Sequence, residues 1–537
     1  MGYKYTIIYS IISCVTFVFM IVVDLIFRIL YKGKGQRVTT VTDPLLLLPA
    51  SVLAQKIRSR QLRAEDVMAA YIARAKEVNT LVNAVVGEQY DTALRRAQEL
   101  DSTLDSLSNE EIMQQYSEDQ KPLLGVPLTV KEAFYWTGMA NTSGVTSRKH
   151  LRSTHDAPVL ANLQSAGAIP FLQTNISEVC MWFESSNYVY GCTNNAYDTT
   201  RMVGGSSGGE GCILSTGASV IGIGSDIGGS IRMPCFFNGV FGHKPTGGVV
   251  ENGGQFPIAS PTAMALLATG PMCRYATDLI PMLKVMAGPA GVQQLQLDTN
   301  VELSKLKVIS VPDDGGSLLV SKVDEELVDI QRQVAEYLKK EGALVKETHI
   351  RKFRLGLQMW AGKMNLCKDS PKFATLMSGS ETEHVNCFLE VLKKLTGQSS
   401  HTVPAIALGL VNDILPKYTK SSDDQAVQIL EALRKELLEL MGDDSVLLYP
   451  SHPKLAPYHS HPIFTPFNFA YTAMFNALGF PVTQCPLGLS KDGLPLGVQV
   501  VTTPYNDHLS LAVAKKLEEN FGGWMNPGLQ RNPSLKH

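Results

Sequence analysis

Two glycine-rich runs, each carrying a serine, constrain this chain more than any other part of its sequence. The first covers Gly204–Gly211 and contains Ser206, and the second covers Ser225–Pro234 and contains Ser230. Because glycine permits positive φ and close approach, the second run can point several N–H groups at one place beside a hydroxyl, as in an oxyanion hole next to a nucleophile. A flexible linker, a plain turn and a phosphate cradle are alternatives at this point, although neither run ends in the Gly-Lys-Ser/Thr of a P-loop.

The surroundings of these runs predict local structure. The spacing of Ser207 and Glu210 has the form of a capping box, so we expect a helix here with Ser206 just outside its N-terminus. Between the runs, Val220–Gly224 is apolar and strand-like, which ties both serines to a core. Upstream, Leu128–Val130 predicts a buried strand with Lys131 at its end. A lysine in that place is most often solvated, so Lys131 by itself indicates no function.

The N-terminal segment differs from the rest of the chain. No charged residue occurs from Tyr5 to Val23, a run that approaches the length of a bilayer crossing, and a basic flank follows at Arg28, Lys32, Lys34 and Arg37. A signal peptide is the main alternative, but no small-residue cleavage site precedes the basic flank. We therefore expect residues 1–38 to be a single-pass anchor and 39–537 to be one catalytic domain. The positive flank predicts that this domain faces the cytosol. We expect the enzyme at an intracellular membrane or a lipid-droplet surface.

Composition narrows the function further. With 45% hydrophobic and 18% charged residues the chain is typical of globular proteins, and a net charge of −2 gives no reason to expect a nucleic acid partner. The nine cysteines are scattered and include no C-x-x-C pair, which favours a reduced compartment. His459 and His461 have no cysteine or carboxylate nearby in the sequence at a ligand spacing, so we interpret them as part of a polar loop. We expect neither a metal nor a cofactor.

Hydrophobic periodicity predicts the fold class. A strand at Leu306–Val311, a helix at Lys322–Lys340 and a strand at Ala343–Lys346 form a β-α-β unit, which favours a parallel or mixed sheet with helices on its faces. Thr402–Pro416 is apolar, and it fits either a buried helix or one that dips into a membrane surface.

Taken together, these motifs resemble the amidase signature family. Gly204–Gly209 followed by Asp226–Pro234 is similar to the family's signature, including the interval between the two serines, and Gly125–Glu132 is similar to its lysine motif. The resemblance runs from roughly residue 40 to 520. It implies an α/β/α sandwich with a central mixed, twisted sheet covered by helices, here preceded by an N-terminal transmembrane helix.

The resemblance also implies a Ser–Ser–Lys triad. Ser230 would be the nucleophile that forms an acyl-enzyme, Lys131 would be a base made neutral by burial, and Ser206 would pass protons between them. The oxyanion would be held by the backbone N–H groups of Ile227, Gly228, Gly229 and Ser230. We interpret Asp226 and Arg232 as partners that fix this loop.

The expected substrates follow from the same resemblance. Met181, Trp182 and Phe183 would line an apolar channel for an acyl chain. We expect fatty-acid amides, such as oleamide and N-acyl ethanolamines, to be taken from membrane lipid and cleaved to fatty acid and ammonia or amine. Enzymes of this kind are often homodimers, which makes a homodimer the expected assembly.

Several alternatives remain open. Gly204-x-Ser206-x-Gly208 also satisfies G-x-S-x-G, which would pair Ser206 with His452 or His508. Within the family, the chain could act on short non-lipid amides or esters, or be the amide-hydrolysing subunit of a transamidating complex. A membrane-tethered scaffold without catalysis is the alternative outside enzymes.

Overall fold

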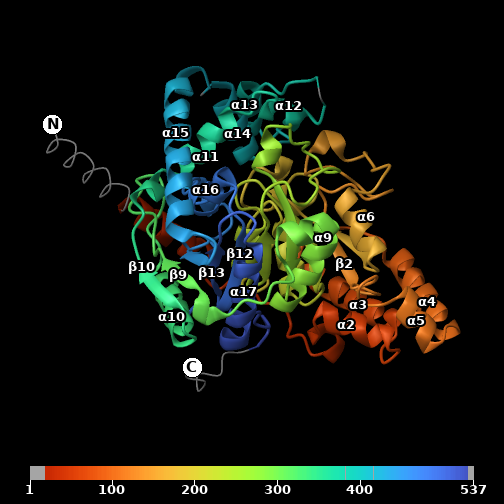
Figure 1. The fold of residues 1–537 in the computed structure, drawn as a ribbon. Helices are drawn as coiled ribbons and strands as arrows, with labels where there is room; N and C mark the ends of the chain where they lie inside the picture. Colours follow the sequence, from red (N-terminus) through yellow and green to blue (C-terminus); the bar gives the residue numbers. More distant parts are fainter. Residues whose placement is uncertain (1–17, 381, 415, 530–537) are drawn as a thin grey trace.

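A mixed sheet of 11 strands forms the centre of the molecule (Figure 1). The computed structural model describes residues 18–380, 382–414 and 416–529. In spatial order the strands are β1 (Val85–Glu88), β3 (Ile169–Thr174), β2 (Pro127–Lys131), β6 (Ile221–Asp226), β8 (Ala268–Cys273), β7 (Phe241–Lys244), β12 (Val482–Leu489), β13 (Pro495–Val501), β11 (Ser445–Tyr449), β9 (Lys307–Ser310) and β10 (Leu344–Glu347).

The direction of the strands varies across the sheet. β2 is parallel to both β3 and β6, and β9 is parallel to both β10 and β11. The other neighbouring pairs are antiparallel. The predicted β-α-β unit is confirmed as β9, α10 and β10. A separate two-stranded sheet joins β4 (Ser186–Asn187) and β5 (Gly191–Cys192).

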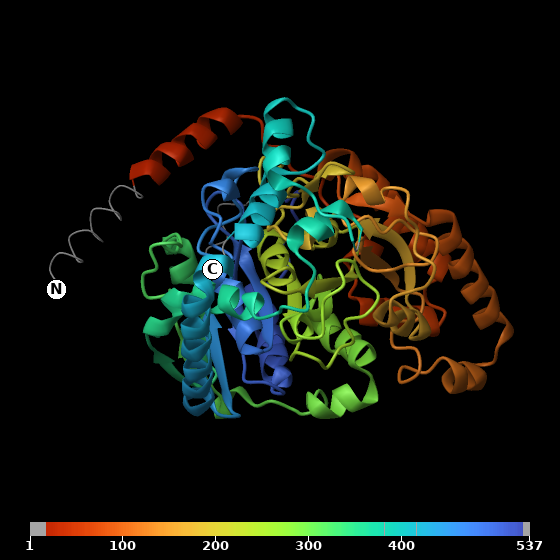
Figure 2. The same ribbon diagram turned by 90° about the horizontal axis from the view of Figure 1, so that it is seen from above.

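Helices surround this sheet, as Figures 1 and 2 show from two directions. They are α2 (Ala50–Arg58), α3 (Ala64–Val82), α4 (Tyr90–Ser106), α5 (Asn109–Gln115), α6 (Pro158–Ser165), α7 (Gly208–Ser215), α8 (Arg232–Asn238), α9 (Leu279–Gln294), α10 (Glu325–Lys340), α11 (Gly356–Asn365), α12 (Phe373–Ser378), α13 (Cys387–Leu395), α14 (Val403–Ile414), α15 (Pro416–Met441), α16 (Ala470–Leu478) and α17 (Asp507–Phe521).

Buried apolar side chains hold these layers together. The main cluster includes residues from Val38 to Trp524, so the two ends of the described catalytic region share one core. The central strands β2, β3, β6 and β8 are buried along their whole length, because both of their faces are covered. A smaller cluster connects α12, α13 and α14.

The N-terminal helix, residues 18–31, lies at the edge of the molecule and is drawn in red in Figure 2. Several of its apolar side chains are exposed, among them Val18, Leu25 and Ile29. The first part of the predicted anchor, residues 1–17, lies outside the described residues. None of the helices in the described residues combines the length and the hydropathy needed to span a membrane.

Candidate active site

Lys131 ends β2 deep inside the molecule, and its side chain has no solvent exposure. Its Nζ lies 2.8 Å from Ser206 Oγ, 3.0 Å from Ser225 Oγ and 3.4 Å from the Ser225 carbonyl oxygen. Burial lowers the pKa of Lys131, since the ammonium loses its hydration, although nearby acidic groups oppose this effect. The alternative of a solvated surface lysine is therefore wrong, and Lys131 is placed to exchange a proton with Ser206.

Ser206 lies in the loop that leads into α7, as predicted. The predicted capping box of Ser207 and Glu210 is wrong. The Ser207 side chain makes no cap hydrogen bond, and Glu210 turns inward. The Glu210 carboxylate accepts hydrogen bonds from the hydroxyls of Thr129 and, at 2.6 Å, Thr174. A Cβ on Gly222 would lie only 1.6 Å from Glu210 Oε1, so β6 needs glycine there to accommodate the carboxylate. Burial raises the pKa of Glu210 to about 7.

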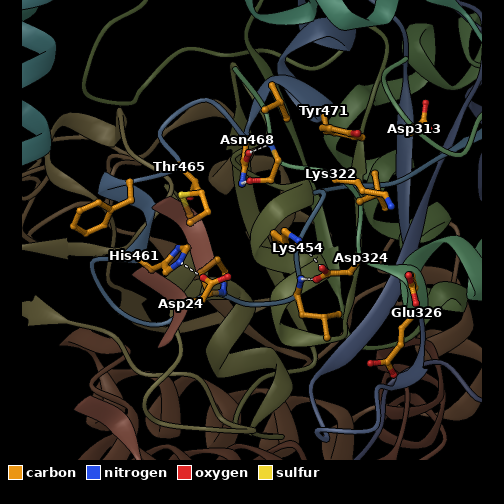
Figure 3. A pocket seen from close by; sticks show the side chains of 18 of the residues that line it. Asp24, Asp313, Lys322, Asp324, Glu326, Lys454, His461, Thr465, Asn468 and Tyr471 are labelled. Carbon is orange, nitrogen blue, oxygen red and sulfur yellow. Dashed lines mark hydrogen bonds and ion pairs between the residues drawn. The ribbon is translucent and has the colours of Figure 1, made fainter. Parts of the chain in front are cut away.

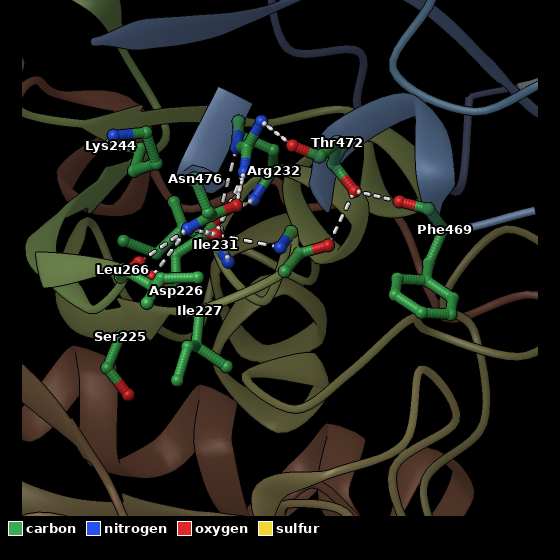
Figure 4. Close-up of polar contacts among 12 residues, drawn as sticks. Ser225, Asp226, Ile227, Ile231, Arg232, Lys244, Leu266, Phe469, Thr472 and Asn476 are labelled. Atoms are coloured by element: carbon green, nitrogen blue, oxygen red, sulfur yellow. Dashed lines mark hydrogen bonds and ion pairs between the residues drawn. The ribbon is translucent and has the colours of Figure 1, made fainter. Parts of the chain in front are cut away.

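The loop that carries Ser230 is fixed by a buried carboxylate (Figure 4). Asp226 accepts hydrogen bonds from the backbone N–H of Gly229 at 2.7 Å and of Ile231 at 3.0 Å. It also forms an ion pair with Arg232 at 2.9 Å, with both side chains fully buried. Asn476 donates to the same carboxylate at 2.9 Å. Asp226 and Arg232 thus fix the loop, in agreement with their interpretation from the sequence.

The predicted oxyanion hole needs one correction. The Gly229 N–H already donates to Asp226, so it is not one of the free donors. Among the described residues, no protein acceptor binds the N–H groups of Ile227, Gly228 or Ser230. Gly229 instead permits the turn itself: its φ is +124°, and a Cβ there would lie 2.0 Å from Thr472 Oγ1. Three N–H groups of the loop therefore remain available to an oxyanion.

The two serine loops meet at their backbones. The Ser207 N–H donates to the Ser230 carbonyl oxygen at 3.3 Å. Gly204 makes this approach possible, because a Cβ at that position would lie 2.8 Å from the backbone nitrogen of Pro234. Ser230 is 8% exposed, whereas Ser206 is 1% exposed. Ser230 is thus the serine of the two with more access from outside.

Aromatic side chains surround the Ser230 loop. Of the predicted channel residues, Phe183 is buried, while Met181 and Trp182 are half-buried. The Phe183 ring lies 6.3 Å from that of Phe469, which in turn lies 5.1 Å from that of Trp360.

Trp360 and Phe469 were missed by the sequence analysis. A Cβ on Gly228 would lie 3.6 Å from the Trp360 ring, and Trp360 Nε1 donates to the Ile227 carbonyl at 2.8 Å. Neither aromatic belongs to a motif, so no signal in the sequence places them at this loop.

The histidines proposed as alternative bases bond elsewhere. His452 Nδ1 lies 2.8 Å from the Lys454 carbonyl, and burial lowers the pKa of His452 to about 3. His508 contacts the Leu295 backbone. Within the described residues, no hydrogen bond joins either histidine to Ser206, whose partner is Lys131.

The two histidines assigned to a polar loop face different groups. His461 Nε2 lies 2.8 Å from Asp24 Oδ1 of the N-terminal helix. His459 faces Glu184 and Cys192, which the sequence separates from it by more than 260 residues. Packing thus brings to His459 a cysteine and a carboxylate that no local spacing in the sequence indicates.

A separate pocket lies between the N-terminal helix and several segments of the main body, among them residues 313–326 and 491–494 (Figure 3). Its volume is about 810 Å³, and neither Lys131, Ser206 nor Ser230 lines it. Polar contacts at its wall include the hydrogen bond of Asp24 with His461 and the ion pair of Lys454 with Asp324, the latter at 2.7 Å. This pocket is distinct from the buried lysine–serine site.

Comparison with known proteins identifies the class. The Amidase family model matches residues 66–511, so the chain belongs to the amidase family and is an amide-hydrolysing enzyme. It is 51% identical over 493 residues to fatty-acid amide hydrolase 2 of Homo sapiens, covering 91% of this chain and 92% of the relative. It is also 51% identical over 498 residues to fatty-acid amide hydrolase 2-A of Danio rerio, with 92% of each chain covered.

Solved structures show the same fold at lower identity. A fatty acid amide hydrolase matches with a TM-score of 0.69 and 22% identity, covering 90% of this chain and 87% of the other. A 6-aminohexanoate cyclic dimer hydrolase matches with a TM-score of 0.72 and 22% identity, covering 90% and 98%. At this identity the likeness shows the fold, an α/β amidase fold with a large mixed sheet.

Proposed function

We propose that this enzyme hydrolyses fatty-acid amides through Ser230, Ser206 and Lys131. The observation that carries the proposal is the 2.8 Å contact between the buried Lys131 Nζ and Ser206 Oγ, beside the glycine loop of Ser230. Burial disfavours the ammonium form of Lys131 and lowers its pKa, which makes the neutral amine available as a base. A serine that binds this lysine can carry a proton to and from a second serine.

The proposed reaction has two stages. Ser230 Oγ attacks the amide carbonyl while its proton passes to Ser206 and the Ser206 proton passes to Lys131, and the free N–H groups of the loop receive the oxyanion. The proton then returns through Ser206 to the leaving nitrogen, which departs as amine or ammonia and leaves an acyl-enzyme. Water, deprotonated by the same route, releases the acid and restores Ser230.

The fatty acyl group is proposed from two sources of support. The relatives at 51% identity are named for fatty-acid amides. In this chain, Phe183, Trp360 and Phe469 place apolar surface next to the Ser230 loop, and such surface favours a hydrocarbon chain over a polar substituent.

Membrane association is proposed from an apolar face on α13. This helix is amphipathic, with Phe388, Leu392 and Leu395 exposed by 65%, 61% and 81%, next to Lys393 and Lys394. An exposed apolar face with adjacent lysines is typical of a helix that lies in the plane of a bilayer surface. It would bring the enzyme to the bilayer that holds a lipid substrate.

Hydrolysis of oleamide and of a short aliphatic amide by the purified full chain in detergent tests the catalytic proposal. Faster release from oleamide is expected. Ser230→Ala should reduce kcat by at least about 10³-fold, and Lys131→Ala by about 10²–10⁴-fold. Full activity in Ser230→Ala would contradict the assignment of the nucleophile, and a preference for the short amide would contradict the fatty acyl substrate.

The membrane proposal is tested with the double variant Leu392→Ser, Leu395→Ser. Its activity on oleamide in lipid vesicles should fall, while its activity in detergent micelles should not change. Leu344→Ser is a matched control, because Leu344 is 70% exposed on the distant edge strand β10. Equal vesicle activity in the double variant and the control would contradict the role of α13.

A further inference from the structure

We propose that Glu184, Cys192 and His459 form a zinc-binding site, separate from the lysine–serine site. The three side chains bring a carboxylate, a thiol and an imidazole together, and these are the ligand types that Zn²⁺ uses in proteins. In the described part of the chain, no other three side chains of these types come as close.

The distances between the ligand atoms fit one face of a tetrahedron. His459 Nδ1 lies 3.3 Å from Cys192 Sγ and 2.9 Å from Glu184 Oε1, and Cys192 Sγ lies 4.0 Å from the same oxygen. Usual bond lengths to zinc, about 2.3 Å for sulfur and about 2.0–2.2 Å for nitrogen and oxygen, put tetrahedral ligands roughly 3.4–3.6 Å apart. Side-chain shifts of a few tenths of an ångström would therefore seat the ion.

The groups behind these ligands already hold them in the required orientation. His459 Nε2 lies 3.1 Å from the Thr199 carbonyl oxygen, so Nε2 carries a proton and donates it there. This leaves Nδ1 as the atom that faces Cys192 and Glu184. The Ser460 N–H donates to the Glu184 carboxylate at 3.0 Å. Metal-binding histidines usually donate their second N–H to a carbonyl or carboxylate, and metal-binding carboxylates are hydrogen-bonded in turn.

The chemistry of the cluster also favours a cation, because the ligand atoms of a carboxylate, a thiol and an imidazole all lie within 4.8 Å of one another. Ligands bind metal in their deprotonated forms, so zinc binding would release protons to solvent.

The position of the site suggests a structural role. Cys192 belongs to β5, Glu184 follows Phe183 of the aromatic group near the active site, and His459 lies in the loop that contacts the N-terminal helix. Cys192 and His459 are half-buried, so an ion and one water as fourth ligand have access. The ion would tie two segments, more than 260 residues apart in the chain, beneath the N-terminal helix.

Titration of the metal-free full chain in detergent with Co²⁺, followed by Zn²⁺, tests this proposal without reference to catalysis. One equivalent of Co²⁺ should produce a thiolate charge-transfer band and tetrahedral d–d bands, and Zn²⁺ should abolish both. Cys192→Ser should remove the charge-transfer band and weaken affinity by more than the ~10–100-fold typical of second-shell changes. His459→Gln should have the same effect on affinity.

His384→Gln is the matched control, because His384 pairs with Asp413 at 3.2 Å without a cysteine in the pair. It should bind Co²⁺ like the wild type. Serine has nearly the same shape as cysteine, so we expect Cys192→Ser to fold. The proposal can therefore be tested with Cys192→Ser even if His459→Gln does not fold. A wild type without the charge-transfer band, or a band that survives in Cys192→Ser, would overturn the proposal.

Discussion

Lys131 can act as a base because its Nζ is buried among neutral oxygen atoms. Its ammonium form would have to be stabilised by Ser206 and by two oxygens of Ser225, all buried with it. Such neutral acceptors replace hydration only in part, so burial lowers the pKa. Ser225 therefore positions the base while it takes no part in the proposed covalent steps.

Ser225→Ala tests this positioning role. Loss of one neutral hydrogen bond is worth about 0.5–1.5 kcal/mol, which predicts a drop in kcat of about two- to tenfold with KM unchanged. Steady-state kinetics on oleamide would measure both constants. Ser215→Ala is the control, because Ser215 Oγ is a buried hydroxyl on α7 whose hydrogen bond, among the described residues, goes to the Cys212 carbonyl of its own helix. A change in KM alone would argue against the role.

The pH dependence of the reaction follows from the state of Lys131. A base must be deprotonated, so kcat/KM should rise with pH and level off above the pKa of Lys131, which burial places below its usual 10.5. A pH profile on oleamide measures this midpoint.

A second buried lysine provides the control for that profile. Burial lowers the pKa of Lys244 to about 7, and Lys244 bonds to the Pro245 carbonyl, away from Ser206. In Lys244→Met the rising limb should persist. If the rise of kcat/KM with pH disappears in Lys244→Met, the profile reflects the titration of Lys244, and the assignment of the profile to Lys131 is wrong.

Among the structural elements, the turn from β6 to α8 depends on one buried ion pair. Asp226 and Arg232 both have 0% exposed side chains, and Arg232 also donates to the Thr472 carbonyl and to Asn476 Oδ1. Burial would raise the pKa of Asp226, but Arg232 and the N–H donors outweigh it and hold this pKa far below its usual range. The loop is thus preorganised by charge before any substrate binds.

Asp226→Asn should destabilise the protein by about 3–5 kcal/mol, because it leaves the Arg232 charge buried without its partner. The free energy of unfolding in urea measures this loss. Asp329→Asn, in the exposed pair with Arg332, should change the free energy by less than about 1 kcal/mol. A similar, small effect in both variants would contradict the importance of the buried pair.

Acid adds a second signature of the same pair. The pKa of Asp226 is lower in the folded protein than in the unfolded chain, where it is about 3.9. Ionised Asp226 therefore stabilises the folded state at any pH above about 3.9, and this stabilisation is lost progressively as the pH falls below that value. The wild type should therefore lose its stability advantage over Asp226→Asn progressively below about pH 4.

At the scale of the whole molecule, the N-terminal helix is held to the main body by aromatic contacts and one polar pair. The rings of Tyr31 and Tyr458 are stacked at 5.1 Å with an angle of 4°, and Arg201 lies over the other side of this pair, 3.6 Å from the Tyr458 ring centre. Asp24 adds its contact with His461, at the wall of the 810 Å³ pocket (Figure 3). The pocket therefore depends on the docking of this helix.

Tyr31→Ala should loosen this docking. A stacked aromatic pair contributes about 0.5–1.5 kcal/mol, so trypsin should cleave at Arg28 and Lys32 about two- to tenfold faster than in the wild type. Mass spectrometry of limited digests measures these rates. Tyr188→Ala is the control, because Tyr188 is an exposed tyrosine that contacts Lys394 on α13. Equal rates in the two variants would show that the stacking does not restrain the helix.

Much of the fold could be predicted because its signals are local. The β-α-β unit of β9, α10 and β10 and the strand that ends at Lys131 both follow from short hydrophobic patterns. The pairing of Lys131 with Ser206 was predicted from the family resemblance, and the structure brings these two side chains into contact. The roles of the triad and of Met181, Trp182 and Phe183 stay predictions.

Local patterns in the sequence show where glycines free the backbone, where apolar strands lie and which residues carry nucleophilic or basic chemistry. They do not show that Lys131 is buried beside Ser225, that Glu210 turns inward instead of capping α7, or that the Gly229 N–H donates to Asp226; packing determines these features. Packing alone brought His459 to Glu184, across 275 residues. The physical reason is that burial, pKa and ligand geometry depend on neighbours brought together by packing, and a local pattern does not contain those neighbours.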